Sequence, residues 1–217
     1  MAKDFGTMQT EVRLWTDTLN DLERLPTSIL KRIINGVLQD LSTRVDWPHL
    51  ESEESYTLAS GDFDYDLPDD FGRPMSFWLY SSSQGWGRVE FCSVEEFDIR
   101  YGLTATSDSG TPGRYTVWAE ELLLGPTPDS SYTGLFKYYS YPADLEDNSD
   151  TNPLMTHAWD VVLYGTLAEV AKFSFEDQRI AMYQAEYDQR FKRLAINAAR
   201  RRSVGARPIS NIPGYLE

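Results

Sequence analysis

The sequence predicts an α+β protein in which helix pairs from the two ends of the chain form a four-helix bundle. An antiparallel β lobe is inserted between the pairs, and an extended tail ends the chain. Apolar residues recur every three or four positions near both ends, and the period changes to two between residues 55 and 141. Four amphipathic helices with short connections within each pair pack most simply as one bundle. The predicted boundaries are 1–50 and 151–202 for the bundle, 51–150 for the β domain and 203–217 for the tail.

The composition is that of a folded protein with an acidic surface. The chain has 217 residues, of which 41% are hydrophobic and 13% aromatic, and this is enough apolar material for a core. Its net charge of −14 argues against a main surface that binds nucleic acid by releasing counterions. Residues 40–150 hold 22 acidic and 6 basic side chains, whereas residues 189–217 hold 1 acidic and 7 basic side chains. The middle of the chain is therefore strongly acidic and its C-terminal end is basic.

Two helices are expected before the β lobe. The first covers residues 10–25, with Trp15 in its apolar stripe, and Pro26 ends it. The second begins at a capping residue directly after this proline and ends before Pro48. Gly36 inside the second helix costs about 1 kcal/mol relative to alanine, so we expect a neighbouring element to pack closely there.

An acidic strand is expected early in the β lobe. In residues 62–67 carboxylates alternate with Phe63, Tyr65 and Leu67, so that one strand face can be buried while the other stays exposed. The spacing resembles the start of a calcium loop, but the sixth position lacks glycine and the twelfth lacks glutamate, so no metal site is expected. The carboxylates of this strand and of the turn after it are Asp62, Asp64, Asp66, Asp69 and Asp70.

The rest of the lobe alternates strands with turns. Ser93 and Glu96 form a capping box that predicts a short helix after the third of the further strands. A hairpin turn is expected at Ala119-Glu120. The further strands are expected at 75–80, 88–92, 114–118, 122–124 and 132–139, where β-branched and aromatic residues are frequent.

Helical periodicity returns after Pro153. A break near Ser174 divides the region into two helices, and the second ends at Arg200-Arg201-Arg202. Residues 203–217 have no period and contain two prolines and two glycines, so we expect a tail that becomes ordered on a partner.

Motifs for common catalytic chemistry are missing from the sequence. No phosphate-binding glycine loop, dinucleotide fingerprint, zinc-protease motif or nucleophile elbow occurs. Cys92 is the single cysteine and is expected to be buried and inert, and His157 is expected to be structural. We therefore expect no enzyme and no cofactor. No apolar run approaches the roughly 18 residues of a membrane span, and the start of the chain has no apolar signal region, so neither a membrane partner nor export is expected.

Two features leave alternatives open. The aromatic residues of the β lobe are typical of a core, but they would also suit a carbohydrate- or receptor-binding module, since flat rings stack on sugars. The basic residues of the last helix could contact phosphate or an acidic protein surface, such as that of a neighbouring copy.

The order of motifs from about residue 10 to residue 200 resembles the head-to-tail adaptor proteins of tailed bacteriophages, also called connector or head completion proteins. The motifs are Leu58-Ala59-Ser60-Gly61 with Leu67-Pro68 and Asp70-Phe71, then Gly110-Thr111-Pro112 with Tyr115-Thr116-Val117 and Leu122-Leu123-Leu124-Gly125-Pro126, then Tyr138-Tyr139 with Tyr141-Pro142 and Asn152-Pro153, and finally Leu163-Tyr164-Gly165 and Ala185 with Tyr187.

The resemblance implies a virion structural protein at the head-tail junction, made in the host cytoplasm. It implies a ring with the twelvefold symmetry of the portal, and contacts with the portal protein and with a tail tube, nozzle or hub protein. Genomic DNA would pass through the ring without specific binding. In such proteins the C-terminal segment commonly reaches the portal, and the corresponding residues here are Arg200, Arg201, Arg202, Arg207, Ile209, Ile212, Tyr215 and Leu216. The five aspartates at 62–70 are expected at the channel lumen or at the rim that faces the tail.

Overall fold

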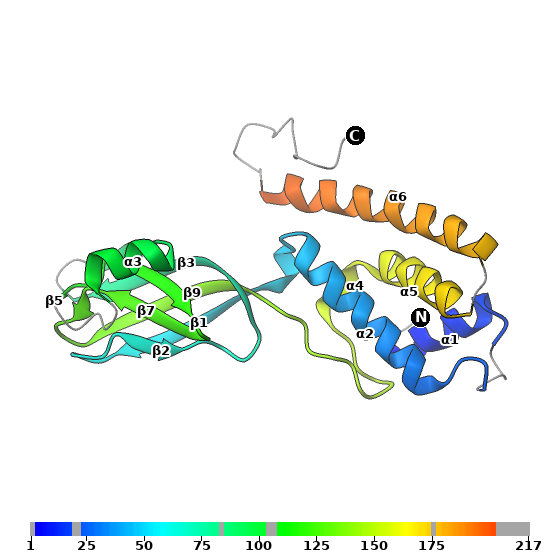
Figure 1. Cartoon of the computed structure of the whole chain (residues 1–217), viewed down its shortest axis with the longest axis horizontal. Helices are drawn as coiled ribbons and strands as arrows, with labels where there is room; N and C mark the ends of the chain where they lie inside the picture. The colour runs from blue at the N-terminus through cyan, green and yellow to red at the C-terminus, as the bar shows by residue number, and fades with distance from the viewer. Residues whose placement is uncertain (1–2, 19–22, 83–84, 103–107, 175–176, 203–217) are drawn as a thin grey trace. The chain divides into compact units, whose positions relative to one another are not determined.

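The chain is described by a computed structural model and divides into two compact units (Figure 1). The helical unit contains the described residues of 1–50 and 141–217, and the β unit contains those of 51–140. The described residues are 3–18, 23–82, 85–102, 108–174 and 177–202.

The helical unit consists of helices from both ends of the chain (Figure 1). Two of these helices begin at side-chain caps: the Asp4 carboxylate accepts the Thr7 N–H at 2.7 Å, and the Asn152 side chain accepts the Met155 N–H at 2.9 Å. The elements are α1 (Phe5–Trp15), α2 (Thr27–Arg44), the 3-10 turn η1 (Pro48–Leu50), α4 (Pro153–His157), α5 (Trp159–Phe173) and α6 (Asp177–Arg202).

The first helix differs from the predicted one at both ends. It begins at Phe5 because Asp4 caps it, and its buried stripe runs through Met8 and Val12. It ends at Trp15. Two residues later, Asp17 has a φ of 55°, which lies outside the right-handed helical region, so the helix cannot continue through it. Trp15 is 49% exposed, so the expectation that it belongs to the buried stripe is wrong. Part of the predicted range, residues 19–22, lies outside the described residues.

The core of the helical unit is tightest around α5. A Cβ at Gly165 would lie 2.9 Å from Val37 Cγ1 on α2 and 3.0 Å from Tyr187 Cε2 on α6, so the two neighbouring helices approach α5 at this glycine. Gly36 is exposed, and a Cβ at this position would have no atom of a neighbouring element within 4 Å. The close approach predicted at Gly36 is therefore found at Gly165 instead.

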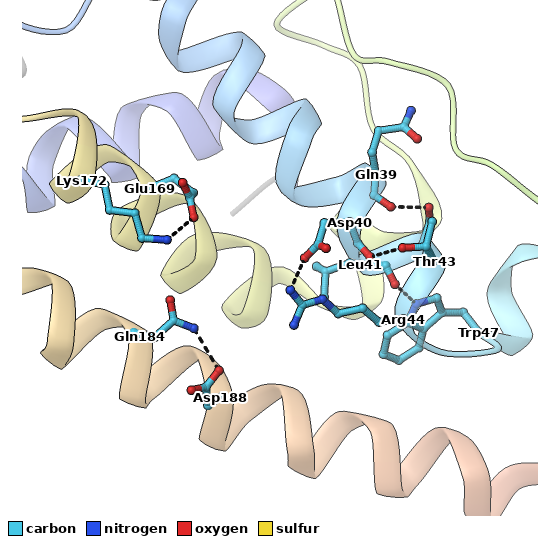
Figure 2. Close-up of polar contacts among 11 residues, drawn as sticks. Gln39, Asp40, Leu41, Thr43, Arg44, Trp47, Glu169, Lys172, Gln184 and Asp188 are labelled. Atoms are coloured by element: carbon cyan, nitrogen blue, oxygen red, sulfur yellow. Dashed lines mark hydrogen bonds and ion pairs between the residues drawn. The ribbon is translucent and has the colours of Figure 1, made fainter. Parts of the chain in front are cut away.

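The C-terminal end of α2 is closed by an aromatic side chain (Figure 2). The buried Trp47 indole Nε1 donates to the Leu41 carbonyl at 2.6 Å, which satisfies a carbonyl of the last helical turn. Arg44 pairs with Asp40 at 2.7 Å, and its guanidinium lies 5.7 Å from the centre of the Phe191 ring on α6. These contacts join the end of α2 to the middle of α6.

The β unit contains a seven-stranded sheet in the order β1-β9-β3-β4-β6-β7-β2 and a two-stranded sheet of β5 and β8. Most neighbours are antiparallel, but β4 and β6 run parallel. The strands are β1 (Glu51–Leu58), β2 (Asp64–Asp66), β3 (Phe71–Ser81), β4 (Gly85–Phe91), β5 (Ser109–Gly110), β6 (Arg114–Trp118), β7 (Glu121–Gly125), β8 (Thr127–Pro128) and β9 (Tyr132–Ser140). The helix α3 (Val94–Tyr101) lies between β4 and β6 in the chain.

The predicted fold class is wrong in both of its parts. The described residues form six α-helices, five of them in the helical unit, rather than a four-helix bundle with one short helix in the lobe, and the β part contains a large mixed sheet rather than an antiparallel one. A separate α4 arises because Ala158, with φ −123° and ψ 24°, leaves the helical region before α5 begins. The parallel pair arises because α3 is part of a crossover long enough to return the chain in the same direction. The protein is a β-rich α+β fold.

The seven-stranded sheet is curled, so that its two edge strands approach each other. The Tyr56 hydroxyl on β1 donates to the Asp66 carbonyl on β2 at 2.8 Å, and the Tyr56 and Tyr65 rings meet edge to face at 6.0 Å. The concave face holds a buried aromatic cluster with Phe77 and Phe136 at its centre, both fully buried. Strong curling is what brings the first and last strands of one sheet together.

Candidate interaction surfaces

The predicted acidic strand lies at one edge of the seven-stranded sheet. Asp64 and Asp66 are on β2 and Asp62 precedes it, and all three are exposed. Phe63, Tyr65 and Leu67 between and after them are half-buried, so the predicted alternation is confirmed. Among the described strands β2 is paired only with β7, and these carboxylates lie on an edge strand that the Tyr56 side chain of β1 also contacts.

The turn after β2 adds two carboxylates to this acidic edge. Asp69 and Asp70 are both exposed, and the Asp70 carboxylate accepts the Tyr138 hydroxyl at 2.7 Å. Burial raises the pKa of Tyr138, so its phenol stays protonated and remains a donor. The structure therefore brings all five predicted aspartates into one short segment, β2 and its flanking turns.

A basic pocket lies in the helical unit, between α6 and the junction of α4 with α5. It is a cavity of about 200 Å³. We call this the basic pocket, and its polar and charged lining residues are Lys3, His157, Asp160, Arg190, Arg193 and Asn197. The first residues of α5 also line it, and Ala158, at the N-cap position of α5, offers no side-chain cap. An uncapped helix N-terminus adds partial positive charge to a pocket that already holds three cationic side chains.

Arg190 is held in place on one side of the basic pocket. Its guanidinium carbon lies 4.3 Å from the centre of the Tyr164 ring, and its nitrogens lie 3.1 Å from the Glu186 carboxylate and 3.7 Å from the Asp160 carboxylate. Trp15 packs edge to face with Tyr164, with 5.9 Å between ring centres. This cluster of tryptophan, tyrosine and arginine has the composition of interaction hot spots.

The two histidines of the chain are stacked beside the basic pocket. The rings of His49 on η1 and His157 on α4 lie 3.6 Å apart at 11°. They also line a smaller cavity with Trp47 and Leu194. His157 is exposed and helps to shape two pockets, in addition to the structural role that we predict for it.

An acidic loop lies elsewhere on the helical unit. The acidic loop, residues 144–150, is anchored by the buried Leu145, whose N–H and carbonyl both bond the Asn35 side chain on α2 at 3.1 Å. The Asp150 carboxylate accepts two backbone N–H groups of the loop at 2.9 and 2.8 Å, and these bonds hold the pKa of Asp150 below its usual range. The loop is therefore preformed rather than loose.

Of the residues predicted to bind the portal, Arg200 is exposed on α6. Arg201 and Arg202 end this helix, and their side chains are outside the described part of the structure. The remaining predicted contacts, Arg207, Ile209, Ile212, Tyr215 and Leu216, lie outside the described residues.

The aromatic residues of the β unit fall into two groups. Most pack in the core around Phe136, as the core interpretation requires. Others are exposed, and Tyr80 and Trp86, on the paired strands β3 and β4, lie 5.4 Å apart between ring centres. Phe91 and Trp118 are exposed as well.

Other kinds of site find little support in the described residues. Within those ranges, no three histidine, cysteine or carboxylate side chains are grouped so that they could hold a metal ion. None of the helices described is sufficiently long and apolar to span a bilayer. Cys92 is buried as predicted, and burial raises the pKa of its thiol.

The basic helix is apparent from the sequence, whereas the basic pocket is not. Arg190, Arg193 and Asn197 share one face of α6 by their spacing of three and four, which the sequence does display. Lys3 and His157 come from distant parts of the chain, and no local pattern connects them to this face.

Exposed charged groups on both units, among them the carboxylates beside β2 and the basic pocket, suit a class of protein that binds other macromolecules. The chain belongs to the SU10 adaptor protein family, whose family model matches residues 3–210. It is therefore a phage structural adaptor protein and a virion component, in agreement with the resemblance to head-to-tail adaptors. No curated protein matches the chain.

Proposed function

We propose that this protein joins the head of a tailed phage to its tail. Copies assemble as a ring with twelvefold symmetry beneath the portal protein, contact a tail tube, nozzle or hub protein below, and continue the DNA channel. The observation that carries the proposal is the family match over residues 3–210. The protein would be made in the host cytoplasm and retained at the head-tail junction.

The C-terminal segment is the proposed portal contact. Its support is the basic end of α6, with Arg200 exposed, followed by the apolar residues of 203–217. A variant that ends at residue 202 should lose portal binding and keep the helical circular dichroism of the full chain. Binding at the affinity of the full chain would contradict this part of the proposal.

The acidic edge is the proposed lumen or tail-facing rim. Its support is the set of exposed carboxylates on and beside β2, which repel DNA phosphates and let the genome slide without specific binding. Asp62, Asp64 and Asp66 changed together to asparagine should change DNA retention or tail docking in assembled particles. The matched control changes three exposed carboxylates of β1 in the same unit, Glu51, Glu53 and Glu54, to glutamine. If the two triple variants show the same DNA retention and tail docking, the acidic edge has no special role at the lumen or the rim.

A carbohydrate- or receptor-binding module is the second candidate function. The observation in its favour is the exposed Tyr80–Trp86 pair on the β3–β4 hairpin. It predicts glycan-dependent quenching of tryptophan fluorescence that the Trp86→Ala variant loses, and no ring on the portal. A ring on the portal together with no glycan-dependent quenching would support the adaptor and contradict the binding module.

A further inference from the structure

We propose that the basic pocket binds a carboxylate from the acidic loop of an adjacent copy in the ring. The inference rests on the proposed ring of copies and assigns to it one specific contact. In this contact Arg193 and Lys3 of the pocket form ion pairs with the carboxylate of Glu146 or Asp147 of the neighbour. These ion pairs lie at the centre of the contact between helical units.

The basic pocket holds positive charge that the described part of the chain does not neutralise. Arg190 is matched by Asp160 and Glu186. Among the described residues Arg193 has no ion pair, and the Lys3 ammonium bonds only a neutral carbonyl, that of Thr156, at 2.7 Å. Both side chains are exposed and line one cavity of a protein whose net charge is −14, so they are available to an external anion.

Arg190 also carries a hydrogen-bond donor that the described residues leave unpaired. The Nε of Arg190 is buried and has no hydrogen-bond partner among the described residues. Buried donors in proteins are nearly always paired, and an unpaired one costs free energy. The N-terminus of α5, which lines the same cavity without a side-chain cap, offers further donors.

A single carboxylate suits this pocket better than a phosphate of DNA. The Asp160 carboxylate also lines the cavity and is 70% exposed, so an incoming group with little negative charge is repelled least. The surrounding rim contains Trp159 and Arg190, with Tyr164 and Trp15 adjacent to them, which is the composition of protein interfaces rather than of a phosphate track.

The acidic loop presents suitable carboxylates at low entropic cost. Leu145 and the Asn35 side chain fix its backbone, and the Lys31 ammonium donates to the Glu146 carbonyl. The side chains of Glu146 and Asp147 are exposed, and neither forms an ion pair within the described part of the chain. Because the loop is preformed, little conformational freedom is lost when it docks.

The acidic loop and the basic pocket are two different surfaces of the helical unit. The centre of the loop is bonded to Lys31 and Asn35 of α2, whereas the basic pocket lies against α6 (Figure 1). The end of the loop approaches the segment that carries Lys3, because Asp150 and Asn148 accept the N–H groups of Phe5 and Gly6. A head-to-tail contact uses two different surfaces of each copy, and repetition of it closes a ring when the rotation is right. Complementary charge on these surfaces would also set the register between neighbours.

The test measures ring assembly on the cognate portal for full-length variants, by cryo-electron microscopy and by the concentration that gives half-maximal assembly. Arg193→Glu should raise this concentration at least tenfold. The matched control, Lys192→Glu, makes the same charge change one residue away on α6, does not line the pocket and should stay within twofold of wild type. The double variant Glu146→Lys with Asp147→Lys should show the same loss as Arg193→Glu. Combining all three substitutions restores the charge pairing and should recover assembly to within threefold.

The outcomes separate this contact from the proposed function. If wild type forms rings and Arg193→Glu behaves like Lys192→Glu, the contact is wrong and the adaptor role stands. If the triple variant assembles no better than Arg193→Glu although its circular dichroism is native, the pairing is wrong. A selective loss of DNA binding with unchanged rings would assign the pocket to phosphate and overturn the inference. If wild type forms no ring on the portal, both the contact and the proposed function fall.

Discussion

Replacing Gly165 with alanine is predicted to be destabilising, although alanine is the better helix former. In a helix interior the change from glycine to alanine gains about 1 kcal/mol. At Gly165 the new methyl would lie 2.9 Å from Val37 Cγ1 and 3.0 Å from the Tyr187 ring. Both neighbours are buried, and a β-branched valine and an aromatic ring cannot move aside at low cost. Overpacking of this kind costs about 1–3 kcal/mol, so the net effect is a loss of up to about 2 kcal/mol.

The same substitution at Gly36 provides the matched control. Gly36 lies in α2, is exposed and has open space where a Cβ would be, so Gly36→Ala should gain the full helix term of about 1 kcal/mol. The difference between the two variants isolates the packing cost at Gly165. Urea unfolding followed by circular dichroism at 222 nm measures both. If Gly165→Ala stabilises the protein as much as Gly36→Ala does, the close approach of α2 and α6 to α5 is refuted.

Three further predictions concern stability. Trp47→Phe removes the indole bond to the Leu41 carbonyl and should lower the free energy of unfolding by about 1–3 kcal/mol in the same urea assay; no loss would mean that the carbonyl finds another partner. Phe136→Ala empties the centre of the β unit and should cost about 3–5 kcal/mol, measured by urea unfolding with near-ultraviolet circular dichroism; a cost below about 1 kcal/mol would contradict its place in the core. Asp150 has a lowered pKa, so its contribution is fully present above its ordinary value of 3.8 and is lost as the pH falls through the lowered value. Wild type and Asp150→Asn should therefore differ in stability above pH 4 and converge in more acidic solution, and a difference that is constant with pH would exclude this linkage.

The local features of the fold could be predicted because their causes are local. The Ser93 hydroxyl accepts the Glu96 N–H at 3.2 Å and begins α3, as the capping box predicts. The hairpin turn at Ala119-Glu120 is also confirmed, with positive φ at both residues between β6 and β7. Such patterns depend on a few neighbouring residues, and sequence displays them directly.

Features that depend on distant partners could not be predicted. The strand β1, Glu51–Leu58, is rich in glutamate and serine, which have low strand propensity, and it forms because it pairs along its whole length with β9. The parallel pairing of β4 with β6 likewise depends on where the chain returns after α3. Without this knowledge the β part is taken for a simple antiparallel lobe.

The same distinction between local and distant causes applies to the candidate surfaces. The acidic segment around β2 could be predicted because alternation within one strand fixes which side chains are exposed. The basic pocket could not, because Lys3 and Arg193 meet only through the packing of α4, α5 and α6. The stack of His49 on His157 joins two segments more than a hundred residues apart in the same manner.

Cryo-electron microscopy of the purified protein mixed with its portal tests the central claim most directly. We expect a ring of copies seated on the tail-facing side of the portal, with the symmetry of the portal and an open channel along its axis. A protein that leaves the portal bare, or that is located elsewhere in the virion, would contradict the account.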